Sequence, residues 1–348
     1  MNAHPQPHTT TQASPGGVAL PGIPVPLSRL VLGTMTFGDT VDRAGAAAML
    51  DTALDAGVTG VDTANAYAGG TTETILAELL PGRRDRIVLA TKAGMPHPDA
   101  GDHSPLSARG MRAALEGSLR RLGTDHVDLF YLHQPDRSTP LAETLGTVAE
   151  FVTEGKIRAL GVSNYAAWQI AEITHTAERV GAPRPVVAQQ LYNLLARRIE
   201  EEYLEYAAYA EYAEYAATSG LRTMVYNPLG GGLLTGRHTF EEQPESGRFG
   251  DSRVAAMYRQ RYWDAGLFEA VRTLSGIAEE AGIPLVDLSL RWLLGRDGVD
   301  ALLLGGSRVE HLRANLAAAA AGPLPADVTA ACDAVGAQLR GPMPAYNR

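Results

Sequence analysis

The 348 residues carry a formal net charge of −9 at pH 7, which argues against nucleic acid or an anionic membrane as the main partner. A hydrophobic fraction of 45% and a charged fraction of 20% are ordinary for a globular protein with a large core. The single cysteine, Cys332, excludes a disulfide framework and a cysteine-rich metal site, and favours a reducing compartment, for which we expect the cytoplasm.

Neither end of the chain suggests a membrane segment. No apolar run reaches spanning length, and the N-terminus lacks the pattern of a signal peptide. Residues 1–17 are rich in His, Thr, Pro and Gln, so we expect them to be disordered ahead of one folded domain at 18–348. Apolar residues around Gly22 predict a short hairpin over 18–26.

Strand-like and helix-like segments then alternate along the chain. The strand candidates are short, largely apolar runs: Arg29–Leu32, Thr59–Val61, Arg86–Ala90, Val127–Leu132, Ile157–Leu160, Pro185–Gln189, Thr223–Tyr226 and Ala301–Leu304. Such strands are typical of parallel sheets covered by helices.

Apolar residues at helical spacing lie between these strands. One helix begins near Thr72; a second is bounded by Ser107 as N-cap and Gly123 as stop. A third follows the pair Thr139–Pro140, a cap and a first-turn residue, and ends at Gly155. Further patterns cover Tyr165–Arg179, Ile199–Ser219, Trp263–Ala281, Pro284–Leu294 and Arg308–Ala320.

Repeated strand–helix units without a break in composition predict an α/β fold, a single closed (β/α)8 TIM barrel with long βα-loops. A doubly wound sheet is the rival architecture, but the G-x-G-x-x-G fingerprint of that fold does not occur.

Ionisable residues stand where the predicted strands end. Asp62 ends the second strand and Tyr67 follows it, Lys92 ends the third, and His133 ends the fourth. In a barrel these ends share one face. An ammonium lowers the pKa of a nearby phenol, and a carboxylate holds that ammonium in place. The set could protonate a carbonyl oxygen while a hydride reaches its carbon. The alternative is a structural Lys92–Asp62 ion pair beside a satisfied core histidine.

Three later segments have the composition of a cofactor site. Ser163, Asn164 and Gln190 could hold a carboxamide, and Tyr192 could stack on a flat ring. Asn164 could instead cap the next helix. Gly305, Ser307 and Arg308 open a helix after strand eight, which suits a phosphate.

The loop Asn227–Arg237 reads NPLGGGLLTGR, and its successive glycines would let backbone N–H groups approach an anion. Its G-x-x-x-x-G spacing is followed by Arg237 and His238 where a P-loop needs Lys and Ser or Thr, so we reject a nucleotide triphosphatase. A glycine-rich loop without a binding role is the remaining alternative.

The motif D-T-A-x-x-Y from Asp62, the strand-ending Lys92 and the segment L-F-Y-L-H ending at His133 resemble the aldo-keto reductases. The resemblance runs from Val31 to Arg348. Longer strings are most similar to the aflatoxin-aldehyde and succinic-semialdehyde reductase branch: YLHQPDRSTPLAETL, LGVSNYAAWQIAEI, NPLGGGLLTGR, MYRQRYW and LGGSRVEHLRANLAA. The resemblance implies an NADP(H)-dependent oxidoreductase that reduces an aldehyde or ketone to the alcohol.

The resemblance also assigns roles to residues. It implies a catalytic tetrad of Asp62, Tyr67, Lys92 and His133, with Tyr67 as general acid and base. Ser307 and Arg308 would bind the adenosine 2′-phosphate and favour NADPH over NADH. The implied cofactor contacts are Asp62, Ser163, Asn164, Gln190, Tyr192, Asn227, Leu229, Gly231, Leu234, Arg237, Arg248, Gly305, Ser307, Arg308, His311 and Asn315. His311 and Ala314 depart from the family pattern, which has Gln and commonly an acidic residue there.

The expected partner is a small carbonyl compound, held through Tyr67 and His133, and no metal ion is expected. Arg261 and the terminal Arg348 resemble carboxylate anchors of the family, although a chain-end arginine is more often simply solvated. The alternative function is an NADPH-binding, redox-sensing regulatory subunit with little turnover. The Tyr-, Glu- and Ala-rich stretch 200–217 predicts an extended solvent-facing helix, and the sequence leaves the oligomeric state open, a homo-oligomer included.

Overall fold

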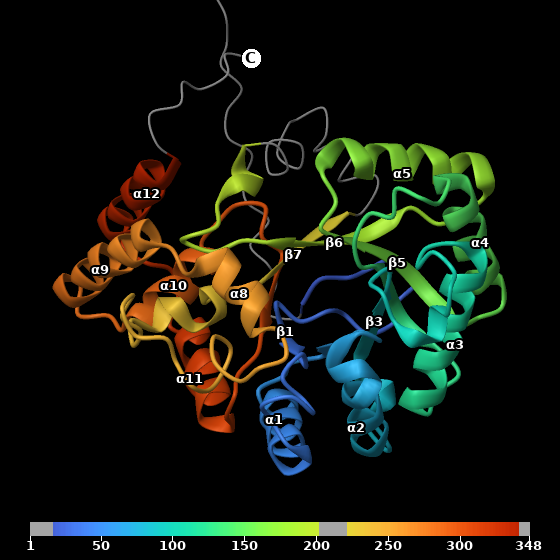
Figure 1. Ribbon diagram of the computed structural model, residues 1–348, viewed down its shortest axis with the longest axis horizontal. Coiled ribbons are helices and arrows are strands. Elements are labelled where there is room, and N and C mark those ends of the chain that lie inside the picture. Colours follow the sequence, from blue (N-terminus) through green and yellow to red (C-terminus); the bar gives the residue numbers. More distant parts are fainter. Residues whose placement is uncertain (1–16, 202–220, 341–348) are drawn as a thin grey trace, which may run out of the picture.

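The computed structural model describes residues 17–201 and 221–340, which contain a closed barrel of parallel strands (Figure 1). The strands follow one another in chain order around the barrel, and β1 pairs with β8 to close it. Their bounds are β1 (Leu30–Gly33), β2 (Gly60–Asp62), β3 (Val88–Ala93), β4 (Val127–Leu132), β5 (Ile157–Ser163), β6 (Pro185–Leu191), β7 (Arg222–Tyr226) and β8 (Ala301–Leu304). The predicted (β/α)8 barrel is confirmed.

Helices surround the strands, with α9 to α12 on one side of the barrel and α3 to α5 on the other (Figure 1). Their bounds are α1 (Arg43–Asp55), α2 (Thr71–Leu79), α3 (Ala108–Leu122), α4 (Leu141–Thr153), α5 (Ala167–Val180), α8 (Ala255–Tyr262), α9 (Ala265–Glu280), α10 (Leu285–Leu294), α11 (Val309–Ala320) and α12 (Ala326–Arg340). Short 3₁₀ turns include η1 (Tyr67–Gly70), η4 (Arg198–Glu200) and η5 (Gly230–Thr235).

The predicted start and stop of α3 are confirmed, and at α4 the predicted stop at Gly155 is confirmed whereas the predicted cap fails. Ser107 caps α3 by accepting a hydrogen bond from the Gly110 N–H at 3.2 Å, and Gly123 ends it with a φ of 63°. Thr139 does not cap α4, because its hydroxyl donates to Asp136 Oδ2 at 2.8 Å and Pro140 immediately precedes the helix.

The segment MYRQRYW, cited above for its resemblance to the family, contributes most of α8. Residues 1–16 of the expected disordered segment, and nearly all of the predicted stretch 200–217, lie outside the described residues.

The N-terminal segment fills one end of the barrel. The predicted hairpin is a single antiparallel bridge between Val18 and Leu27, with N–H···O distances of 2.6 and 2.8 Å. Leu27 packs with Val31 and Val88, which lie near the amino ends of their strands. The polar interior residues therefore lie at the opposite, carboxyl-terminal end. Within 17–201 and 221–340, no helix is long and apolar enough to cross a membrane.

Candidate active site

Two side chains of opposite charge are buried in the barrel interior. Asp62 is the last residue of β2, Lys92 lies in β3, and both are fully buried. The Lys92 ammonium donates hydrogen bonds to Asp62 Oδ1 and, at 2.8 Å, to the Thr63 carbonyl. Pairing of β2 with β3 brings the two residues together. Loss of either partner would leave an uncompensated charge in the core.

Tyr67 and His133 adjoin this ion pair. The Tyr67 hydroxyl, in η1, accepts a hydrogen bond from Lys92 Nζ at 3.3 Å. His133 follows β4, and its ring meets the Tyr67 ring edge-on with centroids 6.0 Å apart. Unlike a satisfied core histidine, His133 has a buried Nδ1 without a hydrogen-bond partner in the described part of the chain. The four strand-end residues thus form one cluster.

The cluster holds Tyr67 and His133 in their neutral forms. Burial raises the pKa of Tyr67 well above its usual range, and the charge of Asp62 raises it further. Burial lowers the pKa of His133 to about 3, and the Lys92 charge acts in the same direction. The predicted lowering of the Tyr67 pKa is therefore wrong, because the loss of hydration on burial and the charge of Asp62 both raise this pKa. At neutral pH Tyr67 keeps a proton that it can donate.

Gln189, and not the predicted Gln190, reaches this cluster. Gln189 Nε2 donates to Asp62 Oδ2 at 2.9 Å, whereas Gln190 Nε2 donates to the Tyr165 carbonyl at 2.7 Å. Consecutive side chains of a strand point to opposite faces, so only one of the two glutamines can point into the barrel. The prediction for Gln190 is wrong by one residue. Counting alternate positions from the interior residue Val187 selects Gln189.

Ser163 and Asn164 lie beside His133, where β5 ends. Asn164 has a positive φ of 63°, and its Nδ2 donates to the His133 carbonyl at 2.9 Å and to Ser163 Oγ at 3.1 Å. Asn164 is not a helix cap, because α5 begins after Ala166, whose N–H donates to Gln169 Oε1 at 2.9 Å. Both predicted residues therefore border the cluster.

The predicted ring-stacking residue Tyr192 lies outside the site. Its side chain is fully buried, its ring centroid lies 5.4 Å from that of Trp292, and its hydroxyl donates to Glu200 Oε1 at 2.5 Å. Tyr226, the last residue of β7, occupies the corresponding place at the site. Its hydroxyl donates to Asn164 Oδ1 at 2.7 Å, and burial raises its pKa to about 12. The sequence signal for Tyr226 was its position at the end of a predicted strand.

The glycine-rich loop after β7 is closed by its own hydrogen bonds. The N–H groups of residues 230–232 donate to the Asn227 carbonyl, to Asn227 Oδ1 and to the Leu229 carbonyl, at 3.1, 2.7 and 2.9 Å. The predicted use of these N–H groups for an anion is therefore wrong. Leu234 is buried in the core, so its side chain does not line a site. Gly231 serves packing, because a Cβ there would lie 2.5 Å from the Tyr258 ring.

A cavity of about 630 Å³ lies between the segment after β7 and the start of α11. Arg237 lines it from one side, and Ser307, Arg308 and His311 line it from the other. Burial lowers the pKa of His311, and the charges of Arg237 and Arg308 lower it further. The cavity also contains two carboxylates, those of Asp39 and Asp251. Guanidinium groups at a helix start provide the donors and charge that suit a phosphate.

One further predicted cofactor contact does not line this cavity. Asn315 is 4% exposed, and its Nδ2 donates to the Gly305 carbonyl at 3.4 Å, which ties α11 to the loop after β8. Arg348 lies outside the described residues.

Arg248 and Arg261 both pack on the Tyr258 ring. Their guanidinium carbons lie 5.0 and 5.8 Å from its centroid. The charge of Arg248 lowers the pKa of Tyr67, against the larger effect of burial. The charge of Arg261 likewise lowers the pKa of Tyr226, against the larger effect of burial. Two cations therefore stand within electrostatic reach of the cluster, one of which, Arg261, was predicted as a substrate contact.

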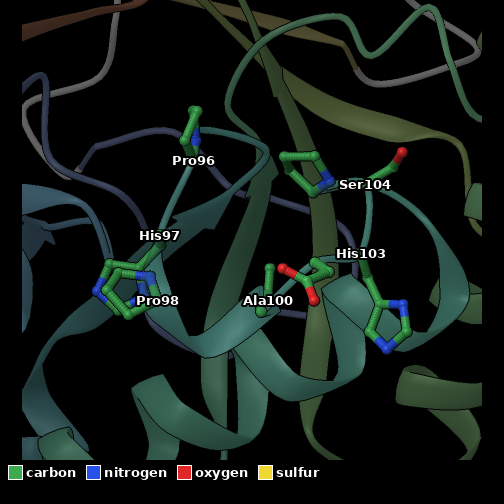
Figure 2. A pocket seen from close by; sticks show the side chains of 9 residues that line it. Pro96, His97, Pro98, Ala100, His103 and Ser104 are labelled. Atoms are coloured by element: carbon green, nitrogen blue, oxygen red, sulfur yellow. The ribbon is translucent and has the colours of Figure 1, made fainter.

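A second cavity, of about 590 Å³, is formed by the loop that joins β3 to α3 (Figure 2). It is lined by residues 96–98 and 100–105, and no member of the Asp62 cluster contributes. In this loop, His97 Nδ1 accepts a hydrogen bond from the Asp99 N–H at 3.2 Å. Nowhere in the described ranges are three His, Cys, Asp or Glu side chains placed to hold a metal ion.

Comparison with known proteins identifies the family. The model of the aldo/keto reductase family matches residues 29–337. The human aflatoxin B1 aldehyde reductase member 2 is 38% identical over 317 residues, covering 86% of this chain and 84% of the relative. The human aldo-keto reductase family 7 member A3 is 40% identical over 311 residues, covering 84% and 89%.

A more distant relative carries a different description. The probable voltage-gated potassium channel subunit beta of Oryza sativa subsp. japonica is 32% identical over 291 residues, covering 82% of this chain and 84% of the relative. The family match and the aldehyde reductase relatives indicate an oxidoreductase that acts on carbonyl compounds. The chain belongs to the aldo/keto reductase family.

Proposed function

We propose that this protein is an NADPH-dependent reductase that converts an aldehyde or ketone to the alcohol, with Tyr67 as the proton donor. One observation carries the proposal: Lys92 Nζ contacts both Asp62 and the Tyr67 hydroxyl, in a site where the phenol stays protonated. When bound, NADPH supplies the hydride. A neutral phenol beside a fixed ammonium is suited to protonate a carbonyl oxygen that gains negative charge.

Each member of the cluster has a separate task in this proposal. Asp62 and Gln189 fix the Lys92 ammonium, which stabilises the Tyr67 phenolate that remains after proton donation. His133, neutral because of its low pKa, would donate one hydrogen bond to the carbonyl oxygen without carrying charge. The neutral forms favour reduction, since alcohol oxidation would need Tyr67 to begin as the phenolate.

The side chains present suit both the adenosine 2′-phosphate end and the nicotinamide end of NADPH. Arg237, Ser307 and Arg308 in the 630 Å³ cavity would hold the 2′-phosphate. At the cluster, Ser163 and Asn164 would hold the carboxamide, and the exposed part of the Tyr226 ring would lie against the nicotinamide. The cation content of the cavity supports NADPH over NADH, because NADH lacks the group that these side chains would bind.

An anionic carbonyl compound is the substrate class that the site supports best. Arg248 and Arg261 are held beside Tyr258 and near the cluster. A guanidinium binds a carboxylate through two parallel hydrogen bonds. Arg348 remains a candidate for the same role.

The test is NADPH oxidation by the purified full-length chain, followed by absorbance with nitrobenzaldehyde and with a panel of carboxylated aldehydes, dialdehydes, quinones and keto-sugars. We expect multiple turnovers, with the highest kcat/KM among carboxylated aldehydes. Tight NADPH binding with a single slow turnover for every compound would instead favour the regulatory subunit, and the rice relative is named as a probable channel subunit.

A further inference from the structure

The backbone that follows Tyr67 adopts an unfavourable conformation. Ala68, Gly69 and Gly70 all have positive φ, at 46°, 63° and 92°. For an alanine the left-handed region costs roughly 1–2 kcal/mol, and such a conformation persists only when its surroundings enforce it. Contacts from outside this loop therefore determine where Tyr67 lies.

The Arg121 side chain, from α3, makes those contacts. A Cβ on Gly70 would lie 2.8 Å from both Cδ and Nε of Arg121, so the loop rests directly on this side chain. Arg121 Nε donates to Glu73 Oε2 at 2.8 Å, and its terminal nitrogens donate to the two Asp99 oxygens at 3.1 and 2.7 Å. Gly117 permits this approach, because a Cβ there would lie 2.2 Å from Asp99 Oδ2.

Glu73 extends the connection to Lys92. Its side chain is fully buried, and its Oε1 accepts a hydrogen bond from Thr91 Oγ1 at 2.6 Å. Thr91 and Lys92 are consecutive in β3, so Thr91 faces the helices while Lys92 faces the barrel interior. The charge of Glu73 also raises the pKa of Lys92, against the larger lowering by burial. The loop of the proton donor packs on Arg121, and both Arg121 and Thr91, in the strand of Lys92, donate hydrogen bonds to the Glu73 carboxylate.

We propose that Arg121 and Glu73 are positioning residues that fix the Tyr67 hydroxyl against Lys92. Arg121 acts through its contact with the Gly70 backbone, and Glu73 acts through its hydrogen bond with Thr91. Together they determine the length of the hydrogen bond between Lys92 Nζ and Tyr67 OH, which is 3.3 Å. That distance is near the upper limit of a hydrogen bond, so a small displacement breaks it. The inference rests on the proposed function, in which Tyr67 donates the proton.

The test compares Arg121→Met with Arg112→Met, a matched control on the same helix whose guanidinium pairs with Glu150 and Glu154 at the surface. With NADPH and a neutral aldehyde, Arg121→Met should lower kcat about 100-fold, the effect of misplacing a reacting group by about 1 Å. KM and the Kd of NADPH should stay unchanged. The solvent deuterium isotope effect on kcat should rise, because proton donation becomes slower. Arg112→Met should match the parent protein.

Further variants separate positioning from folding. Arg121→Lys keeps the charge but lacks the planar fork, so it should recover only part of kcat. If Arg121→Met does not fold because Glu73 is left without a cation, the double variant Arg121→Met/Glu73→Gln, in which neither side chain is charged, is used in its place. Thermal unfolding of each variant is recorded beside its kinetics.

The Tyr67→Phe background distinguishes this inference from the proposed function. Adding Arg121→Met there should cause no further loss, because the hydroxyl that Arg121 positions is gone. If Tyr67→Phe alone keeps parental turnover, the proposed function fails. If Tyr67→Phe is inactive but the Arg121 and Glu73 variants keep the parental kcat and isotope effect, the function stands and the positioning role is overturned.

Discussion

Gln189 donates a hydrogen bond of 2.9 Å to the Asp62 oxygen that Lys92 leaves free. Both oxygens of the Asp62 carboxylate, which has no exposure to solvent, are therefore occupied. Replacing Gln189 with Met should lower the free energy of unfolding by about 1–3 kcal/mol, the cost of a buried acceptor without its partner. Urea unfolding measures this change, and kcat should fall as Lys92 loses its fixed position. Equal stability of parent and variant would show that Asp62 does not depend on Gln189.

Tyr67→Phe should lower kcat by roughly two to four orders of magnitude, the usual contribution of general acid catalysis, while NADPH binding is kept. Steady-state kinetics and quenching of intrinsic fluorescence measure the two quantities. Lys92→Met should reduce kcat similarly and should also destabilise the fold, because it leaves Asp62 buried and unpaired. Parental turnover in Tyr67→Phe would exclude Tyr67 as the donor.

The pH dependence follows from the cited pKa shifts. Tyr67 titrates well above 10 and His133 near 3, so kcat for reduction should be flat from about pH 5 to pH 9. Between about pH 6.5 and pH 3 the unfolded chain protonates this histidine and the folded protein does not. Stability should therefore fall as the pH is lowered through that window. In His133→Asn the fall should be shallower, and thermal unfolding at several pH values checks both slopes.

Arg308→Ala should weaken NADPH binding by about 1.5–3 kcal/mol, the contribution of a hydrogen bond to a charged group. NADH binding should change little, because NADH lacks the 2′-phosphate. Isothermal titration with both cofactors measures the difference, and Arg313→Ala on the exposed face of α11 is the control. Equal losses for NADPH and NADH would exclude a 2′-phosphate contact for Arg308.

Arg261→Ala, and separately removal of Arg348, should raise KM for a carboxylated aldehyde such as succinic semialdehyde. A neutral aromatic aldehyde serves as the internal control, because the charge of Arg261 also acts on Tyr226 and its loss could disturb the site in general. Initial rates with both substrates decide the outcome. A parallel change for the two aldehydes, or none, would indicate an uncharged substrate.

The barrel could be predicted because its strands are continuous apolar runs, and Val127–Leu132 and Ala301–Leu304 have the predicted bounds. Because these strands are apolar throughout, the sequence does not show which of their side chains point into the barrel. A strand buried on both faces lacks the polar–apolar alternation that would orient it, so Gln189 and Gln190 were indistinguishable by pattern. Tyr192 was misplaced because its partner Trp292 lies far along the chain.

The sequence predicts which charged residues pair in the site, but not the direction in which the Tyr67 pKa shifts. The pairing of Lys92 with Asp62 followed from their strand ends. The pKa of Tyr67, however, depends on how much water the folded site admits, which no local pattern encodes. The contact of Arg121 with Gly70 joins α3 to an earlier loop through a side chain whose sequence surroundings suggest only a surface arginine.

The pairing of β1 with β8 has a consequence for synthesis on the ribosome. The register that joins Val31 to Leu303 cannot form until nearly the whole barrel sequence has been translated. Until then, β1 and the latest strand present open edges, which are templates for pairing with other chains. Asp62, Lys92 and His133, by contrast, belong to the first half of the nascent chain. The growing polypeptide therefore contains these proton-handling residues well before it acquires Arg308, and the open edge of β1 persists throughout that interval.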